Sequence, residues 1–279
     1  MYEKTIKLGQ HGFVRYVDHM GTDASIVQAA RVSYGDGTKT VSEDTALIEY
    51  LLRNGHTSPF EMLELKLHIK ATVFEARQIV RHRTASWNEV SGRYSVLANE
   101  FWVPEDVRAQ STKNKQCSEG EVENPGLAKY IINVANIIAY EAYKLLLSMG
   151  VGREQARAVL PVSMYTEWYW KIDGNNLMKF LALREDGHAQ AETQAVARAI
   201  REIATDLWPG MMAAYEECIV GGGRFTRTQL NLLRELLCQE YPAAMSLEEV
   251  LAHRMTEANI KLKSSLKDEF IKVLCRGQA

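Results

Sequence analysis

Nine consecutive residues, 63–71, alternate strictly between apolar and polar side chains. A period of two predicts a β-strand with one apolar face and one charged face. Strands of parallel sheets are usually buried on both faces, so this strand is expected in an antiparallel sheet or at a sheet edge, with its charged side wet or under a polar partner. A doubly wound parallel sheet is disfavoured. The apolar face carries Leu63, Leu65, Leu67, Ile69 and Ala71, and the other face carries Glu64, Lys66, His68 and Lys70.

Most of the remaining chain shows helical periodicity. The second half is therefore expected to be almost wholly helical, and the polar segment 105–126 is expected to be a long surface loop. In the helix that begins at Val73, the residues Val73, Ala76 and Val80 are expected to face inward. The sequence thus predicts an α+β fold in which an antiparallel sheet packs against helices. The expected helices cover 24–32, 42–55, 73–83, 127–149, 153–160, 175–185 and 189–207.

Composition excludes several classes of protein. The 279 residues are 46% hydrophobic, which supports a packed core and excludes a disordered chain. The net charge of −2 argues against a nucleic-acid-binding polycation. No apolar run approaches the roughly 20 residues that cross a bilayer, and the chain starts without a signal core, so a soluble cytoplasmic protein without a membrane partner is expected. Four scattered cysteines predict neither a disulfide framework nor a metal site.

One glycine run suggests a domain boundary. Gly221-Gly222-Gly223 is a linker candidate, and the charged sequence after it has a leucine stripe at helical spacing. We expect one main domain over 1–220 and a linker with a helical extension over 221–279. The extension could dock a partner, clamp an oligomer or act as filler, and the sequence does not choose.

The densest polar segment is 81–95, where three arginines, a histidine and several small hydroxyl residues follow an apolar helix. Arginine binds phosphate or carboxylate with a planar fork and stacks on flat rings, so a ring-bearing phosphate ligand is expected. Ser91-Gly92-Arg93 resembles an anion pocket in which a small residue lets backbone N–H groups approach. The alternative is a solvated helix end whose arginines pair with Glu75 and Glu89.

Two further groups of residues are candidates for the same site. Arg153 and Arg157 lie four residues apart and can share one helix face. Arg184 and His188 flank a helix break at Gly187. Each has a structural alternative: Arg153 and Arg157 could pair with Glu154 and its neighbours, Arg184 could form a salt bridge with the acids beside it, and His188 could be an ordinary structural histidine.

The arginine segment also resembles a known family. Arg81-His82-Arg83, seven residues and then Ser91 resemble the R-H-R-x7-S signature of the flavin-dependent thymidylate synthases. The resemblance covers about residues 8–217 and leaves out the sequence after the glycine linker. Further segments similar to the family, in the family's order, are Ala29–Ser33, Gly55–Glu61, Ala156–Pro161 and Leu183–Gln190.

The resemblance implies an activity, its cofactors and an assembly. The family makes dTMP from dUMP, with 5,10-methylenetetrahydrofolate as the methylene donor and NADPH as the reductant, through bound FAD. It implies a methyltransferase of nucleotide biosynthesis and a homotetramer whose active sites are each built from several subunits. Separate arginine clusters within one chain are consistent with such sharing.

The resemblance also implies roles for individual residues. Arg184 is the expected catalytic residue, because a fixed positive charge beside the uracil ring favours loss of the N3 proton. His56 corresponds to a position near the flavin and folate. Positions that correspond to flavin contacts are Ser58, Arg81, His82, Arg83, Glu89, Asp173, Gly174, Asn175, Lys179 and His188. Positions that correspond to dUMP contacts are Gln78, Arg81, Glu89, Ser91, Gly92, Arg93, Arg157 and Arg184.

Two points in this assignment depend on chemistry. The segment 173–179 departs from the family pattern, and an acidic Asp173 beside a pyrophosphate is unfavourable unless Lys179 or another subunit offsets it. No cysteine has a setting suited to a nucleophile, and Ser91 lacks an adjacent base, so Ser91 is interpreted as a phosphate ligand. Hydride delivery from reduced flavin is then expected to drive the reaction.

Two other functions compete with this interpretation. A nucleic-acid or nucleotide-binding module without catalysis would use the arginines with Trp87, Tyr94 and Trp102 as stacking platforms. A flavoprotein with another substrate should lack the pair Arg157 and Arg184, which this chain has.

Overall fold

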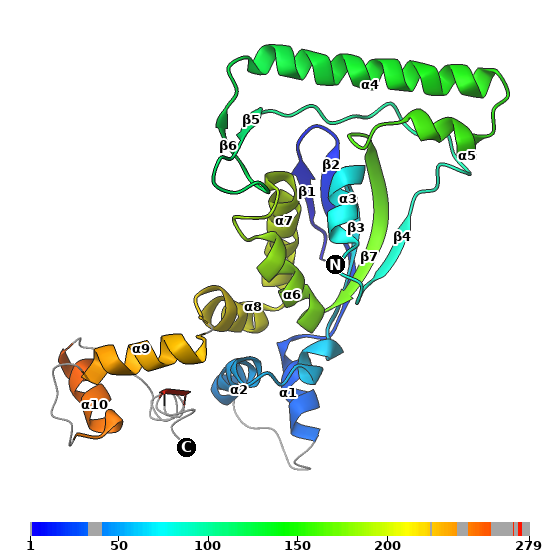
Figure 1. Ribbon diagram of the computed structural model, residues 1–279. Coiled ribbons are helices and arrows are strands. Elements are labelled where there is room, and N and C mark those ends of the chain that lie inside the picture. Colours follow the sequence, from blue (N-terminus) through cyan, green and yellow to red (C-terminus); the bar gives the residue numbers. More distant parts are fainter. Residues whose placement is uncertain are drawn as a thin grey trace. The chain divides into compact units, whose positions relative to one another are not determined.

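The protein forms two compact units, Met1–Gly221 and Gly222–Ala279, each of which is considered by itself. Figure 1 shows the computed structural model, in which residues 2–32, 41–223, 225–238, 245–257, 270, 273 and 274 are described. Within these residues no helix is long and apolar enough to span a membrane. The second unit contains α9 (Arg227–Cys238) and α10 (Leu247–Glu257).

A five-stranded sheet organises the first unit, and every pair of neighbouring strands is antiparallel. Its order is β1-β2-β3-β7-β4. The antiparallel sheet predicted from residues 63–71 is confirmed, and the alternative of an edge position is wrong because β3 lies between β2 and β7. The strands are β1 (Thr5–Leu8), β2 (Gly12–Met20), β3 (Glu64–Thr72), β4 (Ser86–Glu89) and β7 (Tyr165–Asp173).

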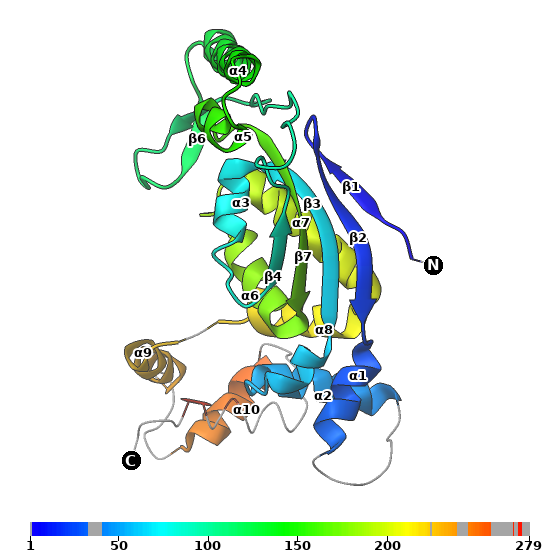
Figure 2. The same cartoon turned by 90° about the vertical axis from the view of Figure 1, so that its right-hand side faces the viewer.

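Helices cover the apolar face of this sheet. Figure 2 shows α3 (Val73–Ile79), α6 (Gly174–Arg184) and α7 (Ala191–Leu207) along one side of the strands. The alternate residues Leu65, Leu67 and Ile69 of β3 are fully buried there, so the period of two in the sequence directly specifies which face joins the core. The other face is polar, and some of its charges are paired across strands, as in the ion pair of Lys171 with Glu64.

His68 shows how that polar face is satisfied. Its ring stacks on Tyr169 of β7 with 4.9 Å between centroids. The two ring nitrogens lie 2.7 Å from Arg15 and 3.3 Å from Glu167. Cross-strand contacts of this kind let a charged face lie in the middle of a sheet.

The prediction of an almost wholly helical second half is wrong at β7. This strand carries buried Thr166, Trp168, Trp170 and Ile172 at alternate positions. The same period of two that identified β3 is therefore present in the sequence. The aromatic residues between the buried ones obscure it, because Tyr165 and Tyr169 are apolar by type although they lie on the polar side.

The segment 105–126 is also not a loop throughout. It contains the two-stranded hairpin of β5 (Arg108–Gln110) and β6 (Ser118–Glu121), and its last two residues already belong to α4 (Pro125–Ser148). Few apolar residues mark these strands, and all four residues of β6 are exposed. The pattern of burial that reveals most strands is therefore missing here.

The helix expected over 73–83 ends at Ile79, directly before the arginine segment. Ala76 is buried as expected, whereas Val80 is 43% exposed and does not face inward. The other expected helices are present, with the segment at 153–160 divided into two short pieces. They are α1 (Asp23–Arg31), α2 (Val41–Arg53), α5 (Arg153–Ala156) and η3 (Arg157–Val159), and η2 (Ser58–Met62), α8 (Pro209–Tyr215) and the π-helical η4 (Glu216–Val220) complete the unit.

Candidate active site

Arg184 joins two elements that are far apart in the sequence. It is the last residue of α6, and its Nη2 donates to the carbonyl oxygen of Gln78 near the end of α3, at 2.9 Å. Its Nε donates to Nε2 of His82, in the turn after α3, at 3.0 Å. The last carbonyls of a helix lack partners within it and carry partial negative charge, so α3 offers a cation a natural binding position.

The surroundings of this pair favour a neutral histidine beside a permanent cation. Burial, with a smaller contribution from the Arg184 charge, lowers the pKa of His82 to about 4. Phe180 packs edge-on against its ring at 4.9 Å between centroids. Burial also lowers the pKa of Arg184, but arginine starts so high that it stays charged.

Gln78 is fixed on its other side by the start of α7. Its Nε2 donates to Oε1 of Gln190 at 2.6 Å, and its Oε1 accepts a hydrogen bond from the hydroxyl of Thr193 at 3.2 Å. Gln190 in turn donates to Glu192, which forms an ion pair with Arg108 at 2.6 Å. Sequence reasoning did not single out Gln190, Thr193 or Glu192, because only the fold brings α7 beside α3.

A second group forms around Gly92, which is buried. A Cβ atom at this position would lie 3.1 Å from Cδ of Arg157 and 2.9 Å from Cδ1 of Leu97. The small residue therefore lets the Arg157 side chain lie directly against the loop after β4. The predicted grouping of Arg157 with Ser91-Gly92-Arg93 is present in the fold.

Neighbouring contacts hold this loop against α5. Arg153 donates to the carbonyl oxygen of Tyr94 at 3.3 Å. Arg93 lies 3.6 Å from Glu154, and both side chains are more than half exposed. An exposed pair of this kind contributes little free energy and can open toward an anion.

The alternative in which the arginines of 81–95 pair with Glu75 and Glu89 is not what the fold shows, because both carboxylates have other partners. Glu75 forms a capping box with Thr72. Glu89 accepts hydrogen bonds from Thr166 at 2.6 Å and from Trp87 at 3.2 Å. The acids beside Arg184 are likewise engaged elsewhere, since Glu185 pairs with Arg201 and Asp186 pairs with His188.

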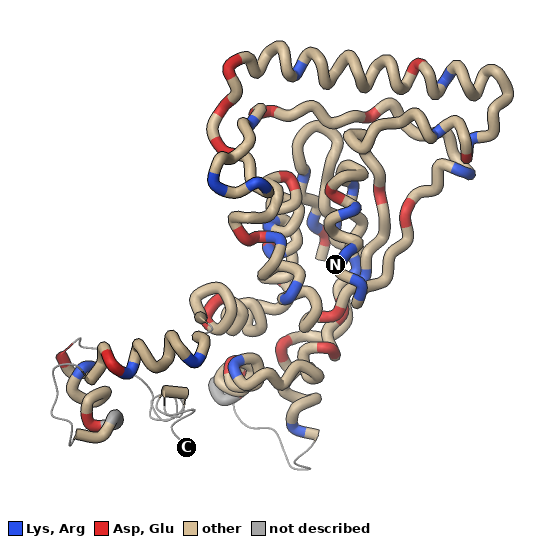
Figure 3. Tube along the Cα trace, viewed as in Figure 1, with Lys and Arg blue, Asp and Glu red and all other residues tan. Residues whose placement is uncertain are grey.

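Arg81 and Arg83 lie in the turn after α3, on either side of His82, and both are exposed. Figure 3 shows basic residues at the turn after α3 and where the loop after β4 meets α5. Between them lies the segment from Ser86 to Ser91, which begins with β4 and would span roughly 16 Å if fully extended, at about 3.3 Å per residue. One chain therefore presents two basic groups at opposite ends of β4.

The remaining predicted cofactor positions divide into exposed and structural ones. Ser58, Lys179 and His188 are exposed, and exposed His56 stacks on Tyr50. Asp173 caps α6, because its carboxylate accepts from the backbone N–H and from Nδ2 of Asn176 at 2.9 and 2.7 Å. Gly174 and Asn175 are buried, and the Asn175 amide donates to Glu61 at 3.2 Å.

Among the described residues, the nucleophile candidates lack the surroundings that activate them, and Cys275 lies outside that part of the chain. The Ser91 hydroxyl oxygen accepts from the backbone N–H of Arg93 at 3.3 Å, and His82 lies beyond the other end of β4. Burial is the largest cause raising the pKa of Cys218, which disfavours its thiolate. Cys117 lies in the turn between β5 and β6, and Cys238 lies in the second unit.

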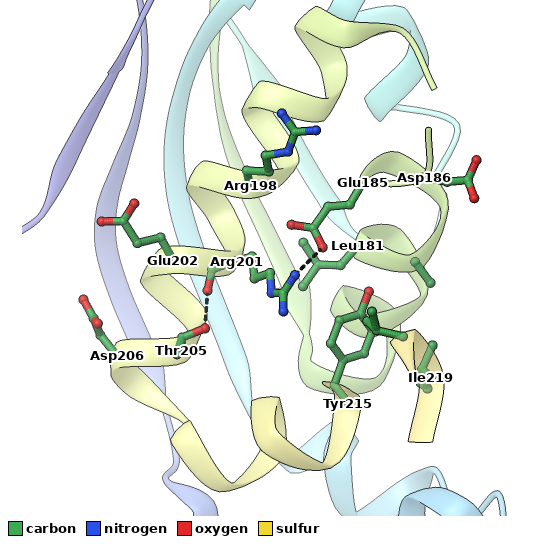
Figure 4. A pocket seen from close by; sticks show the side chains of 12 residues that line it. Leu181, Glu185, Asp186, Arg198, Arg201, Glu202, Thr205, Asp206, Tyr215 and Ile219 are labelled. Carbon is green, nitrogen blue, oxygen red and sulfur yellow. Dashed lines mark hydrogen bonds and ion pairs between the residues drawn. The ribbon is translucent and has the colours of Figure 1, made fainter. Parts of the chain in front are cut away.

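Two cavities lie away from the arginine segment. One, of about 610 Å³, opens between α6, α7 and η4, and Figure 4 shows Arg201 and Glu185 facing each other inside it. The other, of about 330 Å³, lies near Lys70, Glu75, Arg108 and Tyr165. Neither cavity is lined by Arg184 or by the Ser91-Gly92-Arg93 loop.

The fold and site together define a class: an α+β protein with two arginine-rich groups on one chain. A family model described as thymidylate synthase complementing protein matches residues 15–210. A flavin-dependent thymidylate synthase of Thermus thermophilus is 52% identical over 256 residues, which are 91% of this chain and 94% of the relative. One of Treponema denticola is 48% identical over 240 residues, covering 84% and 90% of the two chains.

A solved structure agrees with these sequence matches. The UMP/dUMP methylase PolB from Streptomyces cacaoi, bound with 5-Br dUMP, has a TM-score of 0.69 and 32% identity, covering 76% of this chain and 97% of that chain. The chain belongs to the flavin-dependent thymidylate synthase family, and its cofactor is a flavin.

The comparison corrects the expected extent of the resemblance. The first unit makes up 221 of the 279 residues, so an alignment over 91% of the chain has to continue into the second unit. At least part of the sequence beyond the glycine run is therefore aligned with the Thermus relative. It lies outside the matched family model, which ends at residue 210.

Proposed function

We propose that this protein makes dTMP from dUMP by reductive methylation, as an FAD-dependent methyltransferase. The observation that carries the proposal is the position of Arg184, held by Gln78 and His82 at the end of α3. The family membership of the chain supports the same reaction. The site lies within the first unit, and we assign catalysis to residues 1–220.

The residues of the chain are suited to an FAD molecule. Exposed Arg81 and Arg83 can bind a pyrophosphate, and exposed Ser58, Lys179 and His188 can contact the same cofactor. The Asp173 charge lies at the N-terminus of α6, whose partial positive charge stabilises it. This reduces the expected repulsion between Asp173 and a pyrophosphate. When bound, the flavin supplies hydride transfer.

The two basic groups would bind the two ends of dUMP. Ser91, Gly92, Arg93 and Arg157 supply donors for its phosphate, with Gln78, Arg81 and Glu89 as further contacts. Arg184 lies against the uracil ring, where its fixed charge stabilises the anion left when the N3 proton is lost. Arg93 can leave its exposed ion pair with Glu154 and bind the phosphate at a small cost in free energy.

No protein nucleophile takes part in this proposal. Ser91 acts as a phosphate ligand, because the structure gives its hydroxyl no base. Ser91→Ala should therefore weaken dUMP binding and keep the chemical step. Loss of chemistry with unchanged dUMP binding would overturn this role.

Two features of the single chain support an assembly. The basic groups lie at opposite ends of β4, and a second chain could bring one of each kind together. Ile131, Ile138 and Leu145 of α4 are exposed at a spacing of seven, which is typical of helices that pack against other helices. We propose a homotetramer with shared sites. A cytoplasmic location and no nucleic-acid partner are consistent with the net charge of −2.

The co-substrates are 5,10-methylenetetrahydrofolate as methylene donor and NADPH as reductant. The test is dTMP formation by the purified protein with FAD, dUMP and both co-substrates, and with each omitted in turn. Arg184→Ala should lower kcat/KM for dUMP about 100-fold or more while FAD stays bound. Formation of dTMP at the same rate by the variant would contradict the catalytic role of Arg184.

A further inference from the structure

The position of Arg184 depends on His82, a side chain that the family resemblance assigns to the flavin. We propose that His82 is a positioning residue for Arg184: its Nε2 lone pair fixes the guanidinium so that the remaining N–H groups face the uracil of dUMP. This inference rests on the proposed function, and it adds a second role to the middle residue of the Arg81-His82-Arg83 motif.

The donor count of the guanidinium supports this role. Arginine has five N–H donors in a rigid plane. One is bound by His82 and one by the Gln78 carbonyl, through Nε and Nη2. The other three, two on Nη1 and one on Nη2, belong to the same plane and are directed as a set once the first two are bound. The two fixed acceptors therefore orient the three remaining N–H groups, which can donate to the carbonyl oxygens of a uracil ring.

The two acceptors are not equivalent. The Gln78 carbonyl belongs to the backbone of α3 and stays in place whatever residue is present there. His82 is a side chain in the turn, placed by the edge-on contact with Phe180. Without His82, the Arg184 side chain keeps one anchor and regains rotation about its long axis. A single substitution can thus loosen Arg184 and leave its charge unchanged.

The contact also fixes the tautomer of His82. Because Nε of Arg184 always carries its hydrogen, Nε2 of His82 has to be the acceptor, and a neutral ring then carries its proton on Nδ1. A lowered pKa, down to about 4, is consistent with a ring that stays neutral. His82 therefore has one nitrogen that orients Arg184 and one N–H free to meet a bound ligand.

A double-mutant cycle on the full-length, FAD-loaded protein tests the coupling, with the dissociation constant for dUMP as the readout. His82→Leu should weaken dUMP binding about tenfold, since it removes a hydrogen bond to a charged group. His82→Gln places an oxygen near the former Nε2 and should recover most of that loss. In the Arg184→Ala background, His82→Leu should have almost no further effect. An equal effect in both backgrounds would overturn the inference.

Two controls distinguish the positioning of Arg184 from loss of FAD and from the mere removal of an imidazole. FAD affinity is measured for each variant, and a loss of dUMP binding that simply follows FAD loss would contradict the positioning role. His11→Gln replaces a partly exposed histidine beside Glu100 and should leave dUMP binding unchanged. If the wild-type protein binds no dUMP, the proposed function fails. If the wild-type protein binds dUMP but His82→Leu weakens binding equally in the wild-type and Arg184→Ala backgrounds, only the inference about His82 fails.

The tautomer gives a readout that does not depend on activity. Protein labelled with ¹⁵N-histidine should show a signal from a neutral ring protonated at Nδ1 that is absent in His82→Gln, in addition to any signal from His188, whose Nδ1 faces Asp186. Arg184→Ala should shift the His82 ring toward the usual tautomer and a higher pKa. A His82 ring protonated at Nε2 in the wild-type protein would contradict the hydrogen bond on which the proposal depends.

Discussion

At the scale of single residues, the site depends on how closely side chains can approach the backbone as much as on their charge. Gly92 shows this, because its missing Cβ leaves room for the stem of Arg157. Gly92→Ala should move Arg157 and Leu97 by a few tenths of an ångström, and both are flexible side chains that can shift. We therefore expect nearly unchanged stability and a dUMP dissociation constant raised about tenfold by the loss of a charge-assisted contact.

The measurement for Gly92→Ala is dUMP titration, with the urea midpoint measured in parallel. Gly126→Ala is the matched control, since the nearest atom to its added Cβ would be 3.8 Å away. A lower urea midpoint for Gly92→Ala, with unchanged dUMP affinity, would show that the glycine serves the fold and not the site.

The lowered pKa of His82 predicts how the stability of the protein depends on pH. Its pKa is lowered from 6.5 to about 4 in the folded state. As the pH falls below 6.5, the unfolded chain takes up a proton at this position and the folded chain does not, so the free energy of unfolding falls over this range. Urea midpoints at about pH 7.5 and about pH 5 should differ less for His82→Gln than for wild type. An identical decrease in both would contradict a neutral His82.

At the scale of elements, the start of α6 combines a helix cap with a predicted cofactor position. Asp173→Ala should lower the free energy of unfolding by about 1 kcal/mol, because the first turn loses its cap. Asp173→Asn keeps the cap and removes the charge, so it should retain stability and bind FAD at least as tightly. Lys179→Ala, at an exposed position, is the control for stability. Loss of FAD by a stable Asp173→Asn would mean that the carboxylate itself contacts the cofactor.

The same elements show what the sequence can and cannot predict. The period of two in β3 predicts the strand, its antiparallel setting and its buried face, because leucine and lysine differ clearly in character. In β7 the alternation is of tryptophan with tyrosine, glutamate and lysine, and residue type no longer distinguishes the faces. The family resemblance predicts that Arg157 and Gly92 belong to one site. The contacts of Arg184 with α3 could not be predicted in this way, because they depend on how α6 returns along the sheet.

At the scale of the whole molecule, the exposed face of α4 predicts assembly. Ile138 is 63% exposed in the single chain, and an apolar helix face of this kind is normally covered in solution. Ile138→Glu should convert the proposed tetramer into smaller species, as measured by sedimentation velocity, and should reduce activity if the sites are shared between subunits as proposed. Asn133→Glu, at an exposed position elsewhere around the same helix, should leave the mass unchanged. An unchanged mass for Ile138→Glu would exclude α4 from the interface.

The most direct test of the account is a single turnover followed by the visible spectrum of the flavin. The FAD-loaded protein is reduced without oxygen and mixed with dUMP, with 5,10-methylenetetrahydrofolate, or with both. The account predicts that the flavin is reoxidised only when both are present, and that one dTMP forms for each flavin reoxidised. Reoxidation without dTMP, or dTMP formed while the flavin stays reduced, would contradict it.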